Sequence, residues 1–386
     1  MKAAFERYIA EHTLFDKDKD QCVLAVSGGV DSVVLCHLFH LCGYSFGIAH
    51  CNYMLRGEAS FEDQDFVQQL AKKYGVPFHL KGFVVKKIAE ERKMSIQLAA
   101  RKLRKKWFIY LQNNYGYDRI VTAHHLNDRI ETFLYNFTKG TGIRGLRSIE
   151  AKNGDTIRPL LFATKADIIV FAKKHNLSFR EDASNAETKY MRNKIRHNVV
   201  PALKEINPQL EKTALNTFQH LEDTERIFLW AIQQLRDKAL RTDGENDIID
   251  LAFVQNSIAP TTLLHELISP YGFTTDQVHN ILKKNTQSSG RQFLSTEYRL
   301  LQNRDTLIIS KIDDNPKDET YTIEEGDREV TLGNYILHCF TTRNFPKTFS
   351  NDNRTVWLDE SKLKFPLSIR HWQPGDYFYP LGMKGQ

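Results

Sequence analysis

The chain has 386 residues, of which 41% are hydrophobic and 26% charged, and its formal net charge at pH 7 is +6. At roughly 150 residues per domain, this length predicts two to three domains. No stretch approaches the ~20 apolar residues that cross a bilayer, and the N-terminus lacks the apolar core of a secretory signal. We therefore expect a cytoplasmic protein that does not enter a membrane. The mild positive charge does not by itself indicate a nucleic-acid partner.

The five cysteines are unevenly spaced and include no Cys-x-x-Cys pair. Their odd number and spacing are typical neither of a disulfide framework nor of a zinc site. The sequence therefore predicts reduced thiols with mostly structural roles.

Short apolar runs alternate with helical patterns from residue 21 to about residue 140. The expected strands lie at 21–26, 45–50, 76–83 and 119–123, and the expected helices begin near residues 32, 61, 95 and 127. Buried strands that alternate with helices predict a Rossmann-like α/β domain built on a parallel sheet. Such sheets bind ligands at the carboxyl ends of their strands, and the unusual residues of this chain follow those ends.

The pattern changes after residues 156–161, Thr-Ile-Arg-Pro-Leu-Leu. Residues 189–241 have the spacing of long amphipathic helices, and the last third returns to short alternating strands broken by Asn, Asp and Gly. We expect three domains: an α/β catalytic domain at 1–188, a helical domain at 189–312 and a small α+β domain at 313–386.

Residues 27–32, Ser-Gly-Gly-Val-Asp-Ser, lie between the first expected strand and helix. Two glycines allow a sharp turn close to a polyanion, and the N-H groups at a helix start stabilise phosphate. The loop lacks the Lys of a Walker A motif and the glycine pattern of a dinucleotide fold. A plain turn capped by Ser and Asp would explain Gly-Gly alone, but explains the whole hexapeptide less well.

Two carboxylates follow the fourth expected strand. Asp128 and Glu131 are three residues apart at the start of a helix, which places both on one face at the mouth of the sheet. Two fixed anions suit an ammonium ligand, although acids in a first helical turn also simply complement the helix dipole. The preceding His124 and His125 could contact phosphate or titrate near neutrality, or be structural.

Two segments are strongly basic. Five of the six residues from 101 to 106 are Lys or Arg, and residues 189–204 carry five Lys or Arg without Asp or Glu. A solvated helix face is the usual explanation of such a run. Binding of ATP or RNA phosphate is the sharper one, and we favour it for Arg101 and Arg104 and expect RNA backbone at 189–204.

The Ser27–Ser32 hexapeptide resembles the PP-loop of the N-type ATP pyrophosphatases, which cleave ATP between its α and β phosphates. Further segments resemble the tRNA(Ile)-lysidine synthetase family and occur in its order along the chain. They lie at residues 50–57, 98–108, 122–132, 139–146, 158–161, 181–185, 192–201 and 374–385. The chain departs from the family pattern at Tyr53, usually His, at Asn127, often Asp, and at Arg129, commonly Gln.

This resemblance implies ATP-dependent ligation of lysine to C2 of the wobble cytidine in a tRNA(Ile) with a CAU anticodon, through an adenylated cytidine. It implies ATP and Mg²⁺ as cofactors, and tRNA(Ile) and L-lysine as partners, with a homodimer left open. ATP binding is expected at Ser27, Gly28, Gly29, Val30, Asp31, Ser32, His50, Arg101 and His124. Catalysis is expected from Asp31, Arg104, Asp128 and Glu131. Asp128 and Glu131 are expected to bind lysine, Asp31 to act as base or Mg²⁺ ligand, and Arg192, Asn193, Arg196 and Arg370 to bind tRNA.

The chain stops at Gln386, directly after the motif at 374–385, whereas the family continues further, so we expect a shortened C-terminal domain. Three rival functions remain. A PP-loop tRNA thiolase would need a cysteine pair near the site, and a small-molecule PP-loop ligase would not need the basic helical segment. A non-catalytic tRNA-binding module would not need Asp31, Asp128 and Glu131.

Overall fold

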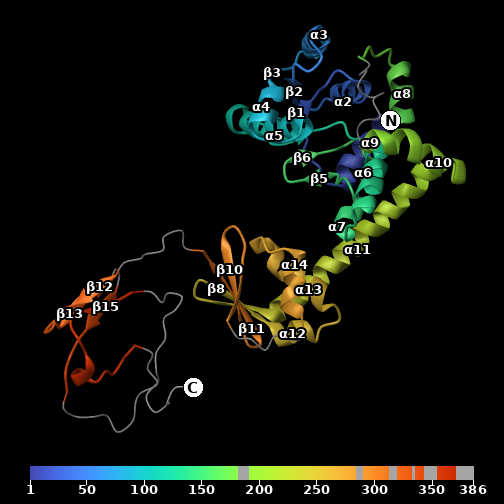
Figure 1. Cartoon of the computed structure of the whole chain (residues 1–386). Coiled ribbons are helices and arrows are strands. Elements are labelled where there is room, and N and C mark those ends of the chain that lie inside the picture. The colour runs from blue at the N-terminus through green and yellow to red at the C-terminus, as the bar shows by residue number, and fades with distance from the viewer. Residues whose placement is uncertain (181–190, 284–289, 313–319, 333–334, 343–353, 371–386) are drawn as a thin grey trace. The chain divides into compact units, whose positions relative to one another are not determined.

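The computed structural model describes residues 1–180, 191–283, 290–312, 320–332, 335–342 and 354–370 (Figure 1). These residues form two compact units, Met1–Gln234 and Leu235–Gln386. The motifs at 181–185 and 374–385 lie outside the described residues, as do residues 313–319 at the start of the third expected domain. The three-domain division at 1–188, 189–312 and 313–386 stays a prediction.

The first unit is built on a six-stranded sheet with the order β3-β2-β1-β4-β6-β5. Every neighbouring pair is parallel except β5 and β6, so the expected Rossmann-like sheet is confirmed. The strands are β1 (Cys22–Ala25), β2 (Phe46–Asn52), β3 (Phe78–Gly82), β4 (Arg119–Val121), β5 (Lys152–Asn153) and β6 (Thr156–Ile157). The order reverses direction at β1, because β2 and β4 flank it, and this is the switch point where such sheets bind ligands.

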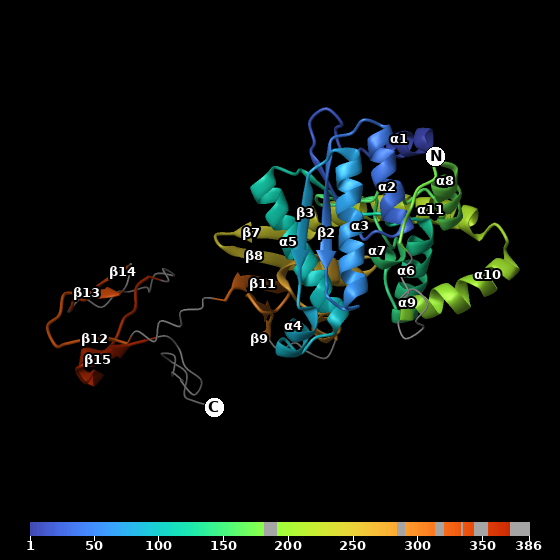
Figure 2. The same cartoon turned by 90° about the horizontal axis from the view of Figure 1, so that it is seen from above.

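Helices cover both faces of this sheet, as Figures 1 and 2 show. One face carries α1 (Lys2–Glu11), α2 (Val30–Leu41), α3 (Glu58–Tyr74) and α8 (Lys165–Lys174), and the other carries α4 (Val85–Glu91) and α5 (Ile96–Tyr115). Alternation along β1 explains the two cores, since Leu24 packs into the first and Val23 into the second. Helix α2 starts at Val30, two residues before the expected Ser32, because extended Gly29 is its N-cap. Helix α4 was not expected.

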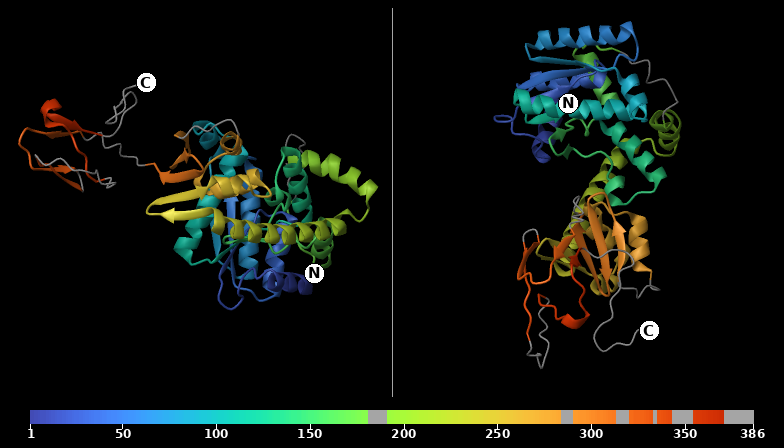
Figure 3. Two further views of the ribbon diagram at one scale, coloured as in Figure 1. Left: turned by 90° about the horizontal axis from the view of Figure 1, so that it is seen from below. Right: turned by 60° about the vertical axis from the view of Figure 1, so that its left-hand side comes forward.

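A smaller apolar cluster lies beside the sheet under α6 (Leu126–Lys139). Leu126 and Ile130 of α6 pack there with Ile195, Val200 and Phe218. These partners come from the π-helix η2 (Ile195–Val199), α10 (Val200–Ile206) and α11 (Leu210–Ala239), and the short helices α7 (Ile143–Leu146) and α9 (Met191–Lys194) adjoin. Figure 3 shows α11 as one uninterrupted helix. The expected long helices in 189–241 are therefore present, and they fix the orientation of α6.

The second unit contains a five-stranded antiparallel sheet with the order β7-β8-β11-β10-β9. Its strands are β7 (Leu240–Asp243), β8 (Asn246–Asp250), β9 (Arg291–Leu294), β10 (Tyr298–Asn303) and β11 (Thr306–Lys311), with helices α12 (Leu251–Gln255), α13 (Pro260–Ile268), η3 (Ser269–Tyr271) and α14 (Thr275–Leu282). The short strands expected in the last third of the chain are confirmed here by β9, β10 and β11, whereas β7 and β8 were not expected.

Two further strand pairs follow in the second unit. They are β12 (Tyr321–Ile323) with β15 (Leu367–Ile369), and β13 (Glu329–Leu332) with β14 (Tyr335–His338), while η4 (Glu360–Lys362) precedes β15. Across all the described segments, no helix combines the length and apolar character that would let it cross a membrane.

The packing of α2 on the sheet gives a stability prediction. Phe39 is fully buried, and its ring meets Phe5, Phe15, Tyr44 and Phe46 at centroid distances of 5.6–5.8 Å. Phe39→Ala should lower the free energy of unfolding of this unit by about 3–5 kcal/mol, and Phe39→Leu by clearly less, because less cavity remains. Hydrogen exchange of the β1 and β2 amides measures this unit alone. Equal effects of both substitutions would contradict the packing account.

Candidate active site

The Ser27–Ser32 loop has the geometry of an anion cradle. Gly28 has a φ of +96°, a conformation that side-chain-bearing residues rarely adopt, and Gly29 is the N-cap of α2. The Ser32 hydroxyl donates to the Gly29 carbonyl at 2.8 Å and lies 3.4 Å from the Ser27 hydroxyl. The first N-H groups of a helix have no acceptor within the helix, so the start of α2 offers them to a ligand.

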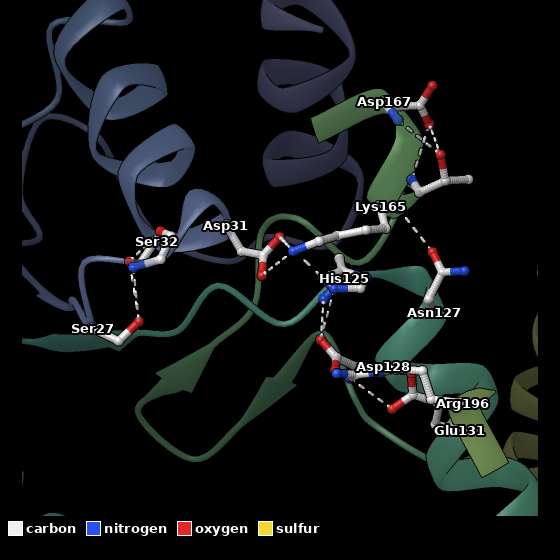
Figure 4. Close-up of polar contacts among 12 residues, drawn as sticks. Ser27, Asp31, Ser32, His125, Asn127, Asp128, Glu131, Lys165, Asp167 and Arg196 are labelled. Atoms are coloured by element: carbon white, nitrogen blue, oxygen red, sulfur yellow. Dashed lines mark hydrogen bonds and ion pairs between the residues drawn. The ribbon is translucent and has the colours of Figure 1, made fainter. Parts of the chain in front are cut away.

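Asp31, in the first turn of α2, is joined to a residue that lies 134 positions along the chain. The Lys165 ammonium donates to both Asp31 carboxylate oxygens, at 2.7 and 2.8 Å (Figure 4). Lys165 opens α8, and its backbone N-H donates to the Asn127 side-chain oxygen at 2.9 Å. The pair therefore connects the segment after β1 with the start of α8, and the bond to Asn127 adds the segment after β4.

His125 lies between two carboxylates. Its Nε2 is 3.9 Å from Asp31 Oδ1 and 3.4 Å from Asp128 Oδ2, and the ring is buried. Its backbone N-H donates to the Asp128 carboxylate at 3.1 Å, so Asp128 also caps α6. Asp128 therefore does both things expected of it: it complements the dipole at the start of α6, and it lies in the site.

The second carboxylate of the expected lysine site, Glu131, is already paired. Arg196 of η2 donates to it through two nitrogens, at 2.7 and 3.0 Å, and Glu131 is only 2% exposed. Arg196 also lies 3.5 Å from Asp128, and Arg192 lies 3.7 Å from Asp128 and 3.9 Å from Glu131. Arg192 and Arg196, two of the residues that we expect to bind tRNA, therefore lie against the acidic pair in this structure, and their tRNA role stays a prediction.

His124 faces a positively charged surrounding. Burial is the main reason that its pKa falls to about 4, and Arg158, Arg104 and Arg192 lower it further, while Asp128 acts in the opposite direction. Burial alone would raise the pKa of Asp128, but His125, His124 and Arg192 hold it below its usual value. The Nδ1 of His124 lies 2.9 Å from the Thr122 hydroxyl. His124 is therefore a neutral imidazole near pH 7.

The remaining expected site residues differ in their surroundings. His50 is buried, and its Nδ1 lies 2.8 Å from the Val26 carbonyl, just before the loop, so it supports the cradle from behind. Arg101 is exposed on α5, and burial together with the nearby Arg101 charge lowers the pKa of the Arg158 guanidinium. Asn193 is half-buried in α9. Arg370 follows β15 in the second unit and is exposed. The roles assigned to these residues stay predictions.

The three departures from the family pattern have visible partners. Arg129 is buried, donates to Glu222 of α11 at 2.6 Å and lies over the Phe218 ring at 4.2 Å. Asn127 accepts from Lys165 and donates to Glu211 at 3.3 Å. Tyr53 stacks on Phe83. These substitutions therefore fit their local packing.

Sequence reasoning missed three residues that the structure brings to the site: Lys165, Arg158 and, as the link between the carboxylates, His125. Arg158 follows β6, and its Nε is buried without a partner among the described residues. Arg158 did stand in a recognised motif and His125 beside His124, so both gave a weak signal. Lys165 gave none, because a lysine at the start of a helix is ordinary.

Comparisons with known proteins agree with this geometry. Residues 1–203 match the PP-loop domain family, and residues 242–312 match the family described as TilS substrate binding domain. The fold and site are those of a PP-loop protein. Three relatives are called tRNA(Ile)-lysidine synthase. Those from Bacteroides thetaiotaomicron and Parabacteroides distasonis are each 36% identical over 98% of this chain and 85% of theirs, and that from Persephonella marina is 31% identical over 95% and 82%. The chain belongs to the tRNA(Ile)-lysidine synthase family.

The surroundings of His124 give a titration prediction. Asp128→Asn should lower the pKa of His124 further, because the favourable anion is lost, and Arg104→Gln should raise it, because a repelling cation is lost. Since the folded pKa lies below that of an unfolded His, the protein should lose stability as the pH falls from about 6.5 towards 4. Proton NMR of the His124 ring measures both shifts. Shifts of the same sign in the two variants would contradict the assigned surroundings.

Proposed function

We propose that this protein uses ATP to ligate lysine to C2 of the wobble cytidine of a tRNA(Ile) with a CAU anticodon, releasing AMP and pyrophosphate. Family membership supports the reaction class. The observation that carries the proposal is the joining of the Ser27–Ser32 cradle to Asp128 through Asp31 and His125. An ATP phosphate site and an acidic site for an amine thus adjoin at one edge of the sheet.

In the first step, the cytidine C2 oxygen attacks the α phosphate, and the bond from that phosphorus to the bridging oxygen of pyrophosphate breaks. The cradle holds the leaving pyrophosphate, because the N-H groups and the dipole at the start of α2 stabilise added negative charge. Arg104 and Arg158 lie near His124 and supply further positive charge. His124 stays neutral, so it can accept or donate a hydrogen bond without adding charge.

In the second step, the lysine side-chain amine attacks C2, and the C2–oxygen bond breaks so that AMP leaves with that oxygen. The attacking amine must first lose a proton, since an unperturbed lysine has a pKa of ~10.4. Asp128 is the better-placed partner for this ammonium, because Arg196 already takes both oxygens of Glu131. Glu131 then acts mainly by holding Arg196 beside Asp128.

Mg²⁺ fits Asp31 as its protein ligand. Mg²⁺ commonly binds one or two carboxylates together with substrate phosphates and water, and Asp31 is the carboxylate of the cradle. Its oxygens hold an ammonium in this structure, so they are oriented for a cation. When bound, the ion would neutralise charge on the phosphates. Without Mg²⁺, the Asp31 oxygens would be able to accept a proton.

The arrangement is less suited to the rival functions. The five cysteines are all free, and those of the sheet region, Cys22, Cys36, Cys42 and Cys51, have pKa values raised mainly by burial. High thiol pKa values do not suit a sulfur-transfer nucleophile.

The proposal has three further parts. They are tRNA binding through the basic segments and by Arg370, a cytoplasmic location and a homodimer.

The assay that tests the function measures AMP, ADP and pyrophosphate formed from ATP, with lysine or total tRNA omitted in turn. AMP and pyrophosphate should form only with tRNA present, because the oxygen that accepts the adenylyl group of ATP belongs to the tRNA base. Formation of ADP would reject a PP-loop ligase. Full AMP production without tRNA would favour a small-molecule ligase, and no turnover with all components would favour a binding module.

Asp128→Asn should raise the KM for lysine about 10–100-fold and the KM for ATP much less, since a hydrogen bond to a charged group contributes roughly 1.5–3 kcal/mol. Glu131→Gln should act in the same direction. Asp223→Asn, an exposed acid on α11, is the matched control and should behave as wild type. Equal changes in the two KM values would argue against a lysine site here.

A further inference from the structure

The Ser27–Ser32 loop contains no cation of its own. Its only charged residue is Asp31, whereas the leaving pyrophosphate of the proposed reaction carries several negative charges. A Walker A loop solves this problem with a lysine inside the motif. The present loop must obtain positive charge from elsewhere in the fold, from a bound cation, or from both.

Lys165 is placed to provide that charge. Its ammonium contacts both oxygens of Asp31, one residue after the start of α2, at 2.7 and 2.8 Å (Figure 4). Its backbone is held by Asn127, and α8 packs on α2 through the sheet-face core. The root of the side chain is therefore fixed while its ammonium stands beside the cradle.

Two other cations near the loop, Arg180 and Arg196, are more fully compensated. Arg180 touches the loop through its backbone N-H, which donates to the Gly28 carbonyl at 2.9 Å, but its guanidinium is shared by Glu62 and Asp63. Arg196 is paired with the buried Glu131 through two nitrogens. Among the described residues, the Lys165 ammonium pairs with one carboxylate alone, and that carboxylate is the proposed Mg²⁺ ligand.

We propose that Lys165 is a pyrophosphate-binding residue, supplying to the Ser27–Ser32 loop the cation that its sequence lacks. This inference rests on the proposed function and extends it. Without bound phosphate, the Lys165 ammonium pairs with the Asp31 carboxylate. When phosphates bind, the Lys165 ammonium turns to the β and γ phosphates, and the Asp31 oxygens that it leaves would be able to hold Mg²⁺.

The exposure of the pair is consistent with this exchange. The side chains of Lys165 and Asp31 are 40% and 29% exposed, so their ion pair is screened and contributes little to stability. A lysine ammonium on a flexible four-carbon stem can move between acceptors at low cost. In the pair of Arg196 with Glu131 the carboxylate is only 3% exposed, so an exchange of its partner would cost more.

The test measures binding of inorganic pyrophosphate to the full chain by calorimetry, in the presence of Mg²⁺ and without tRNA or lysine. Lys165→Gln should weaken pyrophosphate binding about tenfold or more, because a charge-assisted contact is lost. Lys165→Arg should retain most of the affinity. Lys173→Gln, an exposed lysine at the other end of α8, is the control and should match wild type. AMP binding should be unchanged in Lys165→Gln, because AMP lacks the β and γ phosphates.

A second comparison removes the Asp31 carboxylate, which pairs with Lys165. In Mg²⁺-free buffer, Asp31→Asn should bind pyrophosphate more tightly than wild type, since a repelling anion is lost and the ammonium is released. Adding Lys165→Gln to Asp31→Asn should abolish this gain. If Lys165 only orients Asp31, the double variant and Asp31→Asn will bind equally, which overturns the proposal.

Two other results would also overturn it: pyrophosphate affinity of Lys165→Gln within about twofold of wild type, or an equal loss in Lys173→Gln. Circular dichroism of each variant shows that it is folded, and the Lys165→Arg and Asp31→Asn comparisons remain decisive if Lys165→Gln does not fold. Failure of the proposed function is a separate outcome. Wild-type protein would then form no AMP with ATP, lysine and tRNA, whatever the pyrophosphate titrations show.

Discussion

The parallel pairing of β1 with β4 is the constraint on which the site depends. Cys22 pairs with Arg119 and Leu24 with Val121, so both strands end at the same edge of the sheet. The segments that follow them, Ser27–Ser32 and His124–Asp128, are then forced together although they are almost 100 residues apart in sequence. Every contact among Asp31, His125 and Asp128 is a consequence of this register. Backbone pairing between the two strands thus sets the positions from which the side chains of the site meet.

Charge balance is the second principle of the site. Each acid there has a cationic or imidazole partner: Asp31 has Lys165, Asp128 has His125, and Glu131 has Arg196. Pairing of this kind avoids the large cost of burying an isolated charge. It also means that an incoming charged substrate exchanges partners with groups already present. Such exchange costs less than stripping water from free charges, and it favours ligands whose charges match the pattern.

Much of the fold could be predicted from sequence, because the signals are local. The strand-and-helix alternation, the glycine turn and the placing of Asp128 and Glu131 on one helix depend on neighbouring residues. The pairs that define the site do not. Lys165 with Asp31 and Arg196 with Glu131 join segments 134 and 65 positions apart, and nothing in either segment announces its partner. The unexpected β7 and β8 have polar ends, Asp243 and Asn246, and follow a long helix, so the apolar pattern of the helix dominated the prediction.

The link between Arg129 and Glu222 has a consequence for how this sequence can vary. Arg129 is buried between Glu222, Phe218 and the Arg147 carbonyl, so it connects α6 to α11 by charge and by ring contact. A Gln at position 129 could not neutralise Glu222, which is only 17% exposed and would then carry an unpaired charge. A relative that lacks Arg at position 129 should therefore also lack an acid at position 222. An exchange of one without the other, in a chimera between relatives, would disturb α6, the helix that carries Asp128 and Glu131, although neither exchanged residue belongs to the proposed site.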